Sequence, residues 1–228
     1  MCIRDRTETS IENLKKSAIP DTHIYKTGNT VIDALLHTVE NNKADLSYIG
    51  LHPDLKTILL TSHRRENFGE PIKNICKAVL ELVEKNKDIQ VVYPVHLNPN
   101  VQKPVYELLD KKERIHLIEP MEYAPFSTLM KESHLIMTDS GGVQEEAPSL
   151  GKPVLVLRTT TERPEAVEYG TVKLVGTNKE DIVSEVQKLL DNEEEYKKMS
   201  EAINPYGDGL ASQRIVEIIR KEFYSKLD

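Results

Sequence analysis

The chain has 228 residues, of which 29% are charged and 39% are hydrophobic, proportions that are ordinary for a globular protein. Its formal net charge of −7 argues against a protein that binds nucleic acid through phosphate contacts, and no apolar run reaches the roughly 20 residues of a membrane span. Two cysteines without metal-type spacing, and no signal-peptide pattern, indicate a reducing compartment, so we expect a cytoplasmic protein that does not bind a membrane.

The N-terminal part of the chain predicts two helices around a short strand. Residues 1–6 (MCIRDR) match no element that we can justify, and we interpret them as a non-native lead from sequence assembly. Helix signals begin at Thr7, with Ser10 as the expected N-cap residue. A strand at 23–26, a glycine turn and a helix at 31–39 follow. The abrupt start suggests that the chain begins inside a larger protein.

From Thr57 the sequence alternates between strand and helix patterns. Short apolar runs typical of buried parallel strands occur at 57–60, 89–95, 115–118, 135–138, 154–157 and 172–175. Amphipathic spacing and helix-start signals predict helices at 72–83, 99–109, 126–131, 181–190 and 212–223, with a charged segment at 191–198 before the last. Cys76 lies on an apolar helix face, which predicts a buried free thiol. The alternation predicts an α/β fold, a Rossmann-like doubly wound parallel sheet.

The segment 134–146 (HLIMTDSGGVQEE) predicts a strand, a glycine turn and the start of a helix. Gly141 and Gly142 let a ligand approach the backbone, and the free amides after Ser140 suit an anion such as a diphosphate. Glu146 lies four residues after Gly142, so its carboxylate can reach a diol above the turn. A nucleotide would satisfy both features. The alternative is an ordinary turn whose acidic residues interact with the helix dipole.

Other polar clusters follow the remaining predicted strands, at the edge where the carboxyl ends of the strands meet. The basic segment 63–65 suits anionic oxygens, or it forms a surface loop in which Glu66 neutralises an arginine. His96 is either a ligand or a hydrogen-bonded structural histidine. Phe126 either accompanies a base or anchors the helix that follows. Loops at the opposite edge show only solvating charge.

The stretch 158–165 (RTTTERPE) adds hydroxyl groups, amides and the guanidinium of Arg163 ahead of a helix that starts at a proline. This composition favours phosphate binding. The segment 204–209 (NPYGDG) is a turn by composition, and taken alone it reads as a helix-capping loop.

Together these residues resemble the non-hydrolysing UDP-N-acetylglucosamine 2-epimerase family, which has the two-domain GT-B glycosyltransferase architecture. The matching blocks are TGNTVIDAL, TSHRRENFG, PVHLNPNV, TDSGGVQEEAPSLGKPVLVLR, TTERPEAV and NPYGDGLASQRI. By this resemblance the chain is the C-terminal half of such a protein, without the N-terminal domain. Residues 7–45 would be the tail of that domain and the hinge, 46–205 the UDP-binding Rossmann-like domain, and 206–228 a crossover helix.

The resemblance implies an isomerase that interconverts UDP-GlcNAc and UDP-ManNAc by eliminating UDP and adding it back to the other face of the sugar. Such an enzyme serves cell-envelope polysaccharide biosynthesis. It implies UDP-GlcNAc and UDP as ligands, no cofactor, no metal and no nucleic acid, and a homodimer at full length. The family's acid–base carboxylates lie in the N-terminal domain, so we expect the present chain to be inactive alone.

The resemblance also implies roles for individual residues. The diphosphate would be held by Ser140, Gly141 and Gly142. The ribose would be held by Glu146, and the uracil by the loop at Phe126. The diphosphate or the sugar would contact His63 and Arg163, which would assist catalysis. A second UDP-sugar, acting as an allosteric activator, would be held by Arg64 and His96.

Two other functions stay open at this point. A hydrolysing relative would release UDP and N-acetylmannosamine, and accumulation of free UDP would identify it. A non-catalytic module that binds UDP-sugars is the alternative from a different class, because the missing domain carries the family's acid–base groups.

Overall fold

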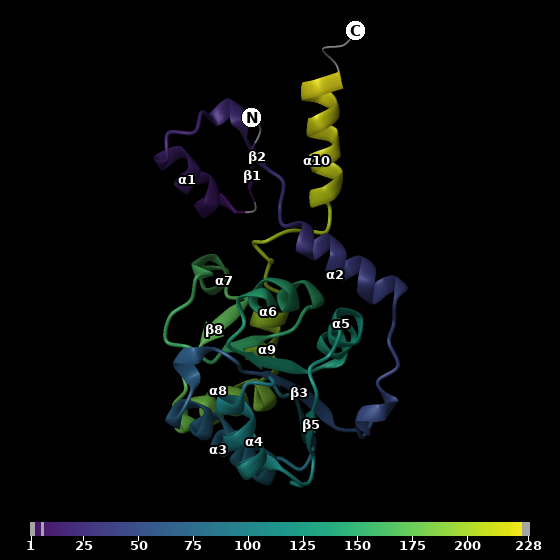
Figure 1. Ribbon diagram of the computed structural model, residues 1–228, viewed down its shortest axis with the longest axis vertical. Coiled ribbons are helices and arrows are strands. Elements are labelled where there is room, and N and C mark those ends of the chain that lie inside the picture. Colours follow the sequence, from purple (N-terminus) through teal and green to yellow (C-terminus); the bar gives the residue numbers. More distant parts are fainter. Residues whose placement is uncertain (1–2, 6, 225–228) are drawn as a thin grey trace.

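The computed structural model describes residues 3–5 and 7–224 and has a six-stranded parallel sheet at its centre (Figure 1). The strands are β3 (Lys56–Thr61), β4 (Ile89–Pro94), β5 (Ile115–Ile118), β6 (Leu135–Thr138), β7 (Val154–Val156) and β8 (Val172–Leu174). Their order across the sheet is β5-β4-β3-β6-β7-β8, and every neighbouring pair is parallel. The predicted Rossmann-like α/β fold is confirmed.

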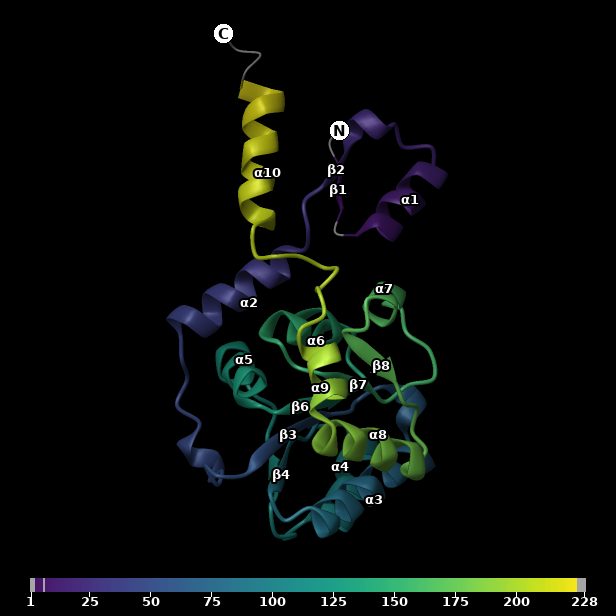
Figure 2. The ribbon, with the colours of Figure 1, turned by 180° about the vertical axis from the view of Figure 1, so that it is seen from behind.

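Helices cover both faces of this sheet (Figure 2). Alternate side chains of β3 point to opposite faces, so Ile58 and Leu60 join one core and Leu59 joins the other. The first core lies under α3 (Glu70–Lys85), α4 (Pro99–Leu109) and α8 (Lys179–Asp191). The second lies under α2 (Thr30–Asn41), α5 (Tyr123–Glu132) and α6 (Gly141–Glu146). A strand buried on both faces reads as a continuous apolar run, which is the pattern that predicted these strands.

The N-terminal residues form a small unit away from this sheet, made of β1 (Ile3–Asp5), α1 (Glu8–Lys16) and β2 (Ile24–Lys26) (Figure 1). No element was predicted before Thr7, whereas β1 pairs in parallel with β2. The expected N-cap residue of α1, Ser10, was wrong. Thr7 caps the helix, because its extended backbone lets its hydroxyl accept the Ser10 amide at 3.2 Å.

The charged segment before the last helix forms a helix of its own, α9 (Glu193–Ser200), which the sequence analysis did not predict. Asn192 caps it by accepting the amides of Glu194 and Glu195 at 3.0 and 3.1 Å. Glu193 pairs with Lys197 one turn later at 2.7 Å. Capping and i,i+4 pairs stabilise this helix where an apolar stripe is lacking.

The last helix, α10 (Ala211–Ile219), projects from the body of the protein next to α2 (Figure 2). Asp33 of α2 caps it from outside, because its carboxylate accepts the amides of Ala211 and Ser212 at 3.2 and 2.7 Å. The helix continues as a π turn over Arg220–Tyr224, and the end of the predicted range 212–223 falls in that turn.

One residue at the opposite edge of the sheet does more than solvate its loop. Arg114 donates to the carbonyl oxygens of Val83, Asn86 and Ile89 at 2.6, 2.6 and 3.0 Å. Its guanidinium thereby satisfies carbonyl groups at the end of α3, so the expectation of solvating charge alone was wrong for this residue.

Two expectations about burial and membranes can be compared with the structure. Cys76 is a buried free cysteine, as predicted, and burial raises the pKa of its thiol to about 12. Within residues 3–5 and 7–224, no helix combines the length and the apolar character needed to cross a bilayer.

Candidate functional site

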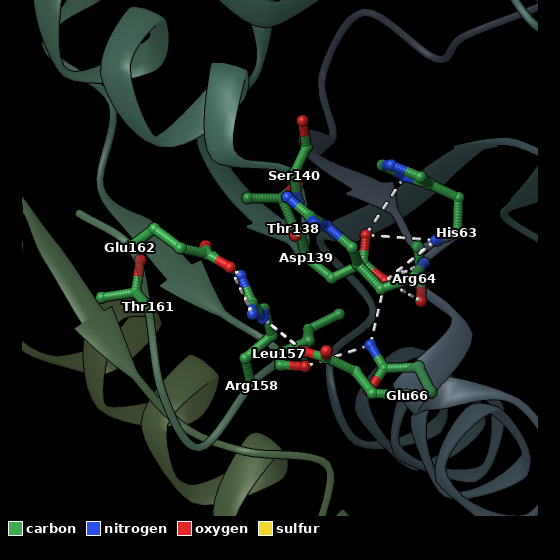
Figure 3. Close-up of polar contacts among 12 residues, drawn as sticks. His63, Arg64, Glu66, Thr138, Asp139, Ser140, Leu157, Arg158, Thr161 and Glu162 are labelled. Atoms are coloured by element: carbon green, nitrogen blue, oxygen red, sulfur yellow. Dashed lines mark hydrogen bonds and ion pairs between the residues drawn. The ribbon is translucent and has the colours of Figure 1, made fainter.

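The parallel strands bring the predicted polar loops to one edge of the sheet. The loops after β3, β6 and β7 meet in Figure 3, where they contribute His63, Arg64, Ser140, Arg158 and Glu162. Because β6 lies between β3 and β7, the glycine turn is central and the other two loops flank it. The sequence prediction of one shared edge is confirmed.

The glycine turn opens α6 between two arginine side chains. A Cβ placed on Gly141 would lie 3.6 Å from Nη2 of Arg64 and 3.7 Å from Nη2 of Arg163. The N-cap residue, Ser140, makes no side-chain cap hydrogen bond to a described residue. Two guanidinium groups therefore flank the first amides of a helix, an arrangement that suits the oxygens of a phosphate group.

A buried carboxylate, Asp139, organises the loop after β3 (Figure 3). Its Oδ2 accepts hydrogen bonds from four donors at 2.9 Å: Ser62 Oγ, the His63 and Arg64 amides, and Asn67 Nδ2. Its Oδ1 lies 3.2 Å from His63 Nδ1. Burial alone would raise the pKa of Asp139, but the hydrogen bonds from His63 and the Arg64 amide outweigh it and leave the pKa below its ordinary value.

Arg163 is held by Glu145, a buried residue of α6. The Nε of Arg163 donates to Glu145 Oε1, and Asn29 Nδ2 donates to Glu145 Oε2 at 2.5 Å. Asn29 is the N-cap residue of α2, so one carboxylate connects the arginine beside the glycine turn to the start of that helix. The guanidinium also donates from Nη1 to the Glu162 carbonyl at 3.0 Å.

Arg158 lies between Glu66, from the loop after β3, and Glu162, from its own loop after β7 (Figure 3). Its Nε donates to Glu66, and its Nη1 and Nη2 donate to Glu162 at 2.7 and 3.0 Å. The hydrogen bonds from Arg158 lower the pKa of Glu162 to about 2. The alternative considered for the basic segment, a surface loop in which Glu66 neutralises one of its arginines, does not describe the contact of Glu66. Its partner comes from the loop after β7.

A cavity of about 240 Å³ lies beside the glycine turn. Apolar residues and two histidines contribute to its lining, among them Pro94, Met121, Phe126, Val143, His63 and His96. The imidazole rings of His63 and His96 are stacked, with centroids 5.7 Å apart. Phe126 also packs against the buried core, so the two roles considered for it are compatible. An apolar slot with few polar groups suits a flat ring.

Glu146 is the last residue of α6, directly after Glu145, and it contacts α5. Tyr123 of α5 donates its hydroxyl to Glu146 Oε1 at 2.8 Å. Burial raises the pKa of Glu146, although the hydrogen bond from Tyr123 opposes this effect. Such a carboxylate is able to accept hydrogen bonds from a diol.

The sequence analysis missed Asp139, Glu145 and Tyr123 as site residues. Asp139 and Glu145 lie inside the recognised segment 134–146, but their partners are far away in the sequence. In the described part of the chain, no cluster of three or more His, Cys, Asp or Glu residues is arranged to hold a metal ion.

Comparison with known proteins gives a consistent result. A family model described as UDP-N-acetylglucosamine 2-epimerase matches residues 5–220. The chain is 53% identical over 222 residues to the UDP-N-acetylglucosamine 2-epimerase of Escherichia coli K12, and 54% identical over 226 residues to that of Campylobacter jejuni. Each match covers 94% of this chain and 59% of the relative.

A solved structure is similar over the same part of the fold. It is the UDP-GlcNAc 2-epimerase from Neisseria meningitidis bound to UDP-GlcNAc, with 51% identity and a TM-score of 0.88. The match covers 95% of this chain and 60% of that one. The chain thus spans 59–60% of the length of these three relatives.

Proposed function

Because this chain belongs to the UDP-N-acetylglucosamine 2-epimerase family, we propose that it is the UDP-binding part of an enzyme that interconverts UDP-GlcNAc and UDP-ManNAc. The reaction eliminates UDP from the sugar and adds it back to the opposite face. UDP must stay bound while the sugar reacts, and this part of the enzyme supplies the grip on its diphosphate. We assign residues 46–205 to the binding domain, 7–45 to the tail of the preceding domain and the hinge, and 206–228 to the C-terminal segment that contains the crossover helix α10.

The observation that carries the proposal is the pair of guanidinium groups beside Gly141. Arg64 and Arg163 approach the glycine turn from the loops after β3 and β7. A diphosphate bound to the amides after Ser140 would lie within reach of both side chains. Each guanidinium is a planar donor that matches phosphate oxygens.

The remaining site residues fit the other parts of UDP. The cavity beside the turn, lined in part by Phe126, takes the uracil ring. Glu146 accepts the ribose hydroxyl groups. His63 lies at the same cavity and next to the diphosphate position, where it contacts the diphosphate or the sugar and assists the reaction.

We further propose that Arg64 and His96 also contact a second UDP-sugar, which acts as an allosteric activator. His96 stacks on His63, and Arg64 lies beside Gly141, so this second ligand would be next to the first. The full-length protein is proposed to be a cytoplasmic homodimer.

Calorimetry with the 228-residue chain tests the binding proposal. UDP should bind more tightly than UMP, because UMP lacks the second phosphate, and more tightly than ADP, because the cavity is small. Arg163→Ala should weaken UDP binding by about 1.5–3 kcal/mol, the range for hydrogen bonds to charged groups.

Arg65→Ala is the matched control, because Arg65 is exposed and lies on the same loop as Arg64. It removes an equal charge near the site and should cost clearly less affinity than Arg163→Ala. Equal affinity for UDP and UMP, or equal losses in the two variants, would contradict the proposed diphosphate site.

A further inference from the structure

The contacts of Asp139 determine where the proton of a neutral His63 must lie. Asp139 is fully buried, and its Oδ1 is 3.2 Å from His63 Nδ1. A carboxylate that accepts this many hydrogen bonds is ionised and only accepts. A lone pair on Nδ1 would be repelled by the carboxylate oxygen at this distance, so the hydrogen of the neutral ring lies on Nδ1, and Nε2 carries a lone pair.

The surroundings of His63 give its Nε2 a defined role. Three groups with charge or titratable protons lie around the ring: Asp139 on one side, the stacked ring of His96, and Arg64, the next residue. His63 and Ser140 line the same cavity. With Nδ1 facing Asp139 at 3.2 Å, the ring has only Nε2 left for a ligand at the glycine turn.

We propose that Asp139 is a positioning residue that keeps the proton on Nδ1 of His63 and presents Nε2 to the anion bound at the glycine turn. A neutral Nε2 cannot donate to a phosphate oxygen, so a bound diphosphate draws a second proton onto the ring. The Asp139 carboxylate then faces an imidazolium. This inference rests on the proposed UDP site for its ligand, but the position of the proton does not depend on that site.

His96 supplies an internal reference with the opposite proton position. Its Nδ1 accepts the Asn98 amide at 3.1 Å, so its neutral ring carries the proton on Nε2. Stacked histidines with opposite tautomers give different ring nitrogen shifts. The two signals are therefore distinguishable in one sample once they are assigned.

Asp139→Asn is designed to reverse the tautomer while it keeps the loop folded. Four donors converge on Oδ2, so the single amide oxygen of asparagine must take that place. The amide nitrogen then occupies the Oδ1 position and donates to Nδ1 of His63. This geometry allows only a proton on Nε2 of the neutral ring.

The first measurement is a long-range nitrogen–proton NMR correlation of the imidazole rings at about pH 8, where a free imidazole is neutral. The His63 signals, among those of seven histidines, are identified by their loss in His63→Ala. We expect the Nδ1–H form in the wild-type chain and the Nε2–H form in Asp139→Asn. An Nε2–H form of His63 in the wild-type chain would overturn the proposal without any variant.

Asn67→Ala is the matched control. It removes one donor to Oδ2 and weakens the same network, but it leaves Oδ1 facing His63. His63 should keep the Nδ1–H form in this variant. A change of tautomer in Asn67→Ala equal to that in Asp139→Asn would show that general loosening of the loop is responsible.

The second measurement is the proton uptake that accompanies UDP binding, obtained from the binding enthalpy in buffers of different ionisation enthalpy at about pH 8. Both imidazole and phosphate are deprotonated there in free solution. The wild-type chain should take up more protons for each UDP bound than Asp139→Asn does, because Nε2 of the variant already carries a proton.

The possible failures are distinguishable. UDP binding without proton uptake in the wild-type chain would overturn the proposed contact between Nε2 and the phosphate. Uptake that survives in His63→Ala but disappears in His96→Asn would assign the proton to His96 and overturn it too. Absence of UDP binding would refute the proposed function, while the tautomer of His63 would still decide the role of Asp139.

Discussion

Buried carboxylates determine how the basic side chains at this edge of the sheet are presented. Asp139 fixes the backbone at His63 and Arg64, and Glu145 holds Nε of Arg163. Arg158 pairs with two glutamates and is buried, so it links two loops and is less available to an anion. Among these arginines, Arg64 and Arg163 are the ones whose terminal nitrogens reach the glycine turn. The role of an arginine near a site is therefore inferred from the groups that it contacts, and not from its place in a motif.

Glu146 gives a residue-scale prediction about the ribose. Glu146→Ala should weaken UDP binding by about 2 kcal/mol, as expected for hydrogen bonds to a charged group. Binding of inorganic pyrophosphate should change little, because that ligand has no diol. Calorimetry with both ligands makes the comparison.

Tyr123→Phe controls for packing in this experiment, since it removes the hydroxyl that contacts Glu146 and leaves the carboxylate in place. It should affect UDP binding less than Glu146→Ala. If Glu146→Ala weakened the binding of UDP and pyrophosphate equally, the residue would act on the conformation at the start of α6 and would not contact the ribose.

At the residue scale, the sequence predicted which side chains lie at this edge of the sheet. It did not predict the buried carboxylates that position them. The placement of His63, Ser140 and Arg163 follows from motif position after parallel strands. The Asp139 network joins positions 72 to 77 residues apart, as for Ser62 and Asn67. Local patterns carry no information about such pairs, because the buried carboxylate and its donors come from different strands.

The turn at 204–209 packs against the start of α2, although the two segments lie far apart in the chain. The Asn29 amide donates to the Tyr206 carbonyl at 2.7 Å, and a Cβ placed on Gly207 would lie 3.4 Å from the Asn29 backbone nitrogen. Tyr206 is buried and its hydroxyl reaches Glu165 at 3.3 Å, while Thr7 donates to the same carboxylate at 2.8 Å. The turn at 204–209 is thus a packing element and not only a capping loop.

Gly207→Ala should destabilise the protein by about 2–3 kcal/mol, because its φ of +151° is a backbone conformation that residues with a Cβ rarely adopt. Urea unfolding measures the change. Gly170→Ala is the control: its φ is +74°, but nothing lies within 4 Å of the added Cβ. It should cost only the backbone strain of about 1–2 kcal/mol. Equal losses would show that a φ of +151° costs alanine no more than a φ of +74° does.

The elements themselves were largely predictable. The bounds expected for α4, β5 and β6 are those observed, because buried strands and proline-started helices leave clear local signals. The misses have long-range or electrostatic causes. Helix α9 has no apolar stripe, and β1 exists through its pairing with β2.

On the scale of the whole molecule, the loops at the carboxyl ends of the strands form an edge whose carboxylates mostly contact cations or hydroxyl groups. Glu66 and Glu162 bind Arg158, Glu145 binds Arg163, and the ionised Asp139 is buried. With a pKa of about 2, Glu162 is a very weak base near neutral pH. This edge is suited to holding an anion in place, and much less to moving protons on a sugar.

We therefore expect that the 228-residue chain binds UDP-GlcNAc but does not epimerise it. Inversion at C2 needs a base on one face of the sugar and an acid on the other, and the carboxylates around the glycine turn are held by other partners. The measurement is exchange of the C2 proton in deuterated water, followed by NMR with UDP-GlcNAc. No deuterium should enter above a protein-free blank.

Incorporation that is lost in Glu162→Gln or Glu66→Gln would place the acid–base groups in the loops that Arg158 links. Loss in Glu122→Gln would place them in the exposed loop before α5. Either result would contradict the inference that this chain binds UDP and that the base lies outside it.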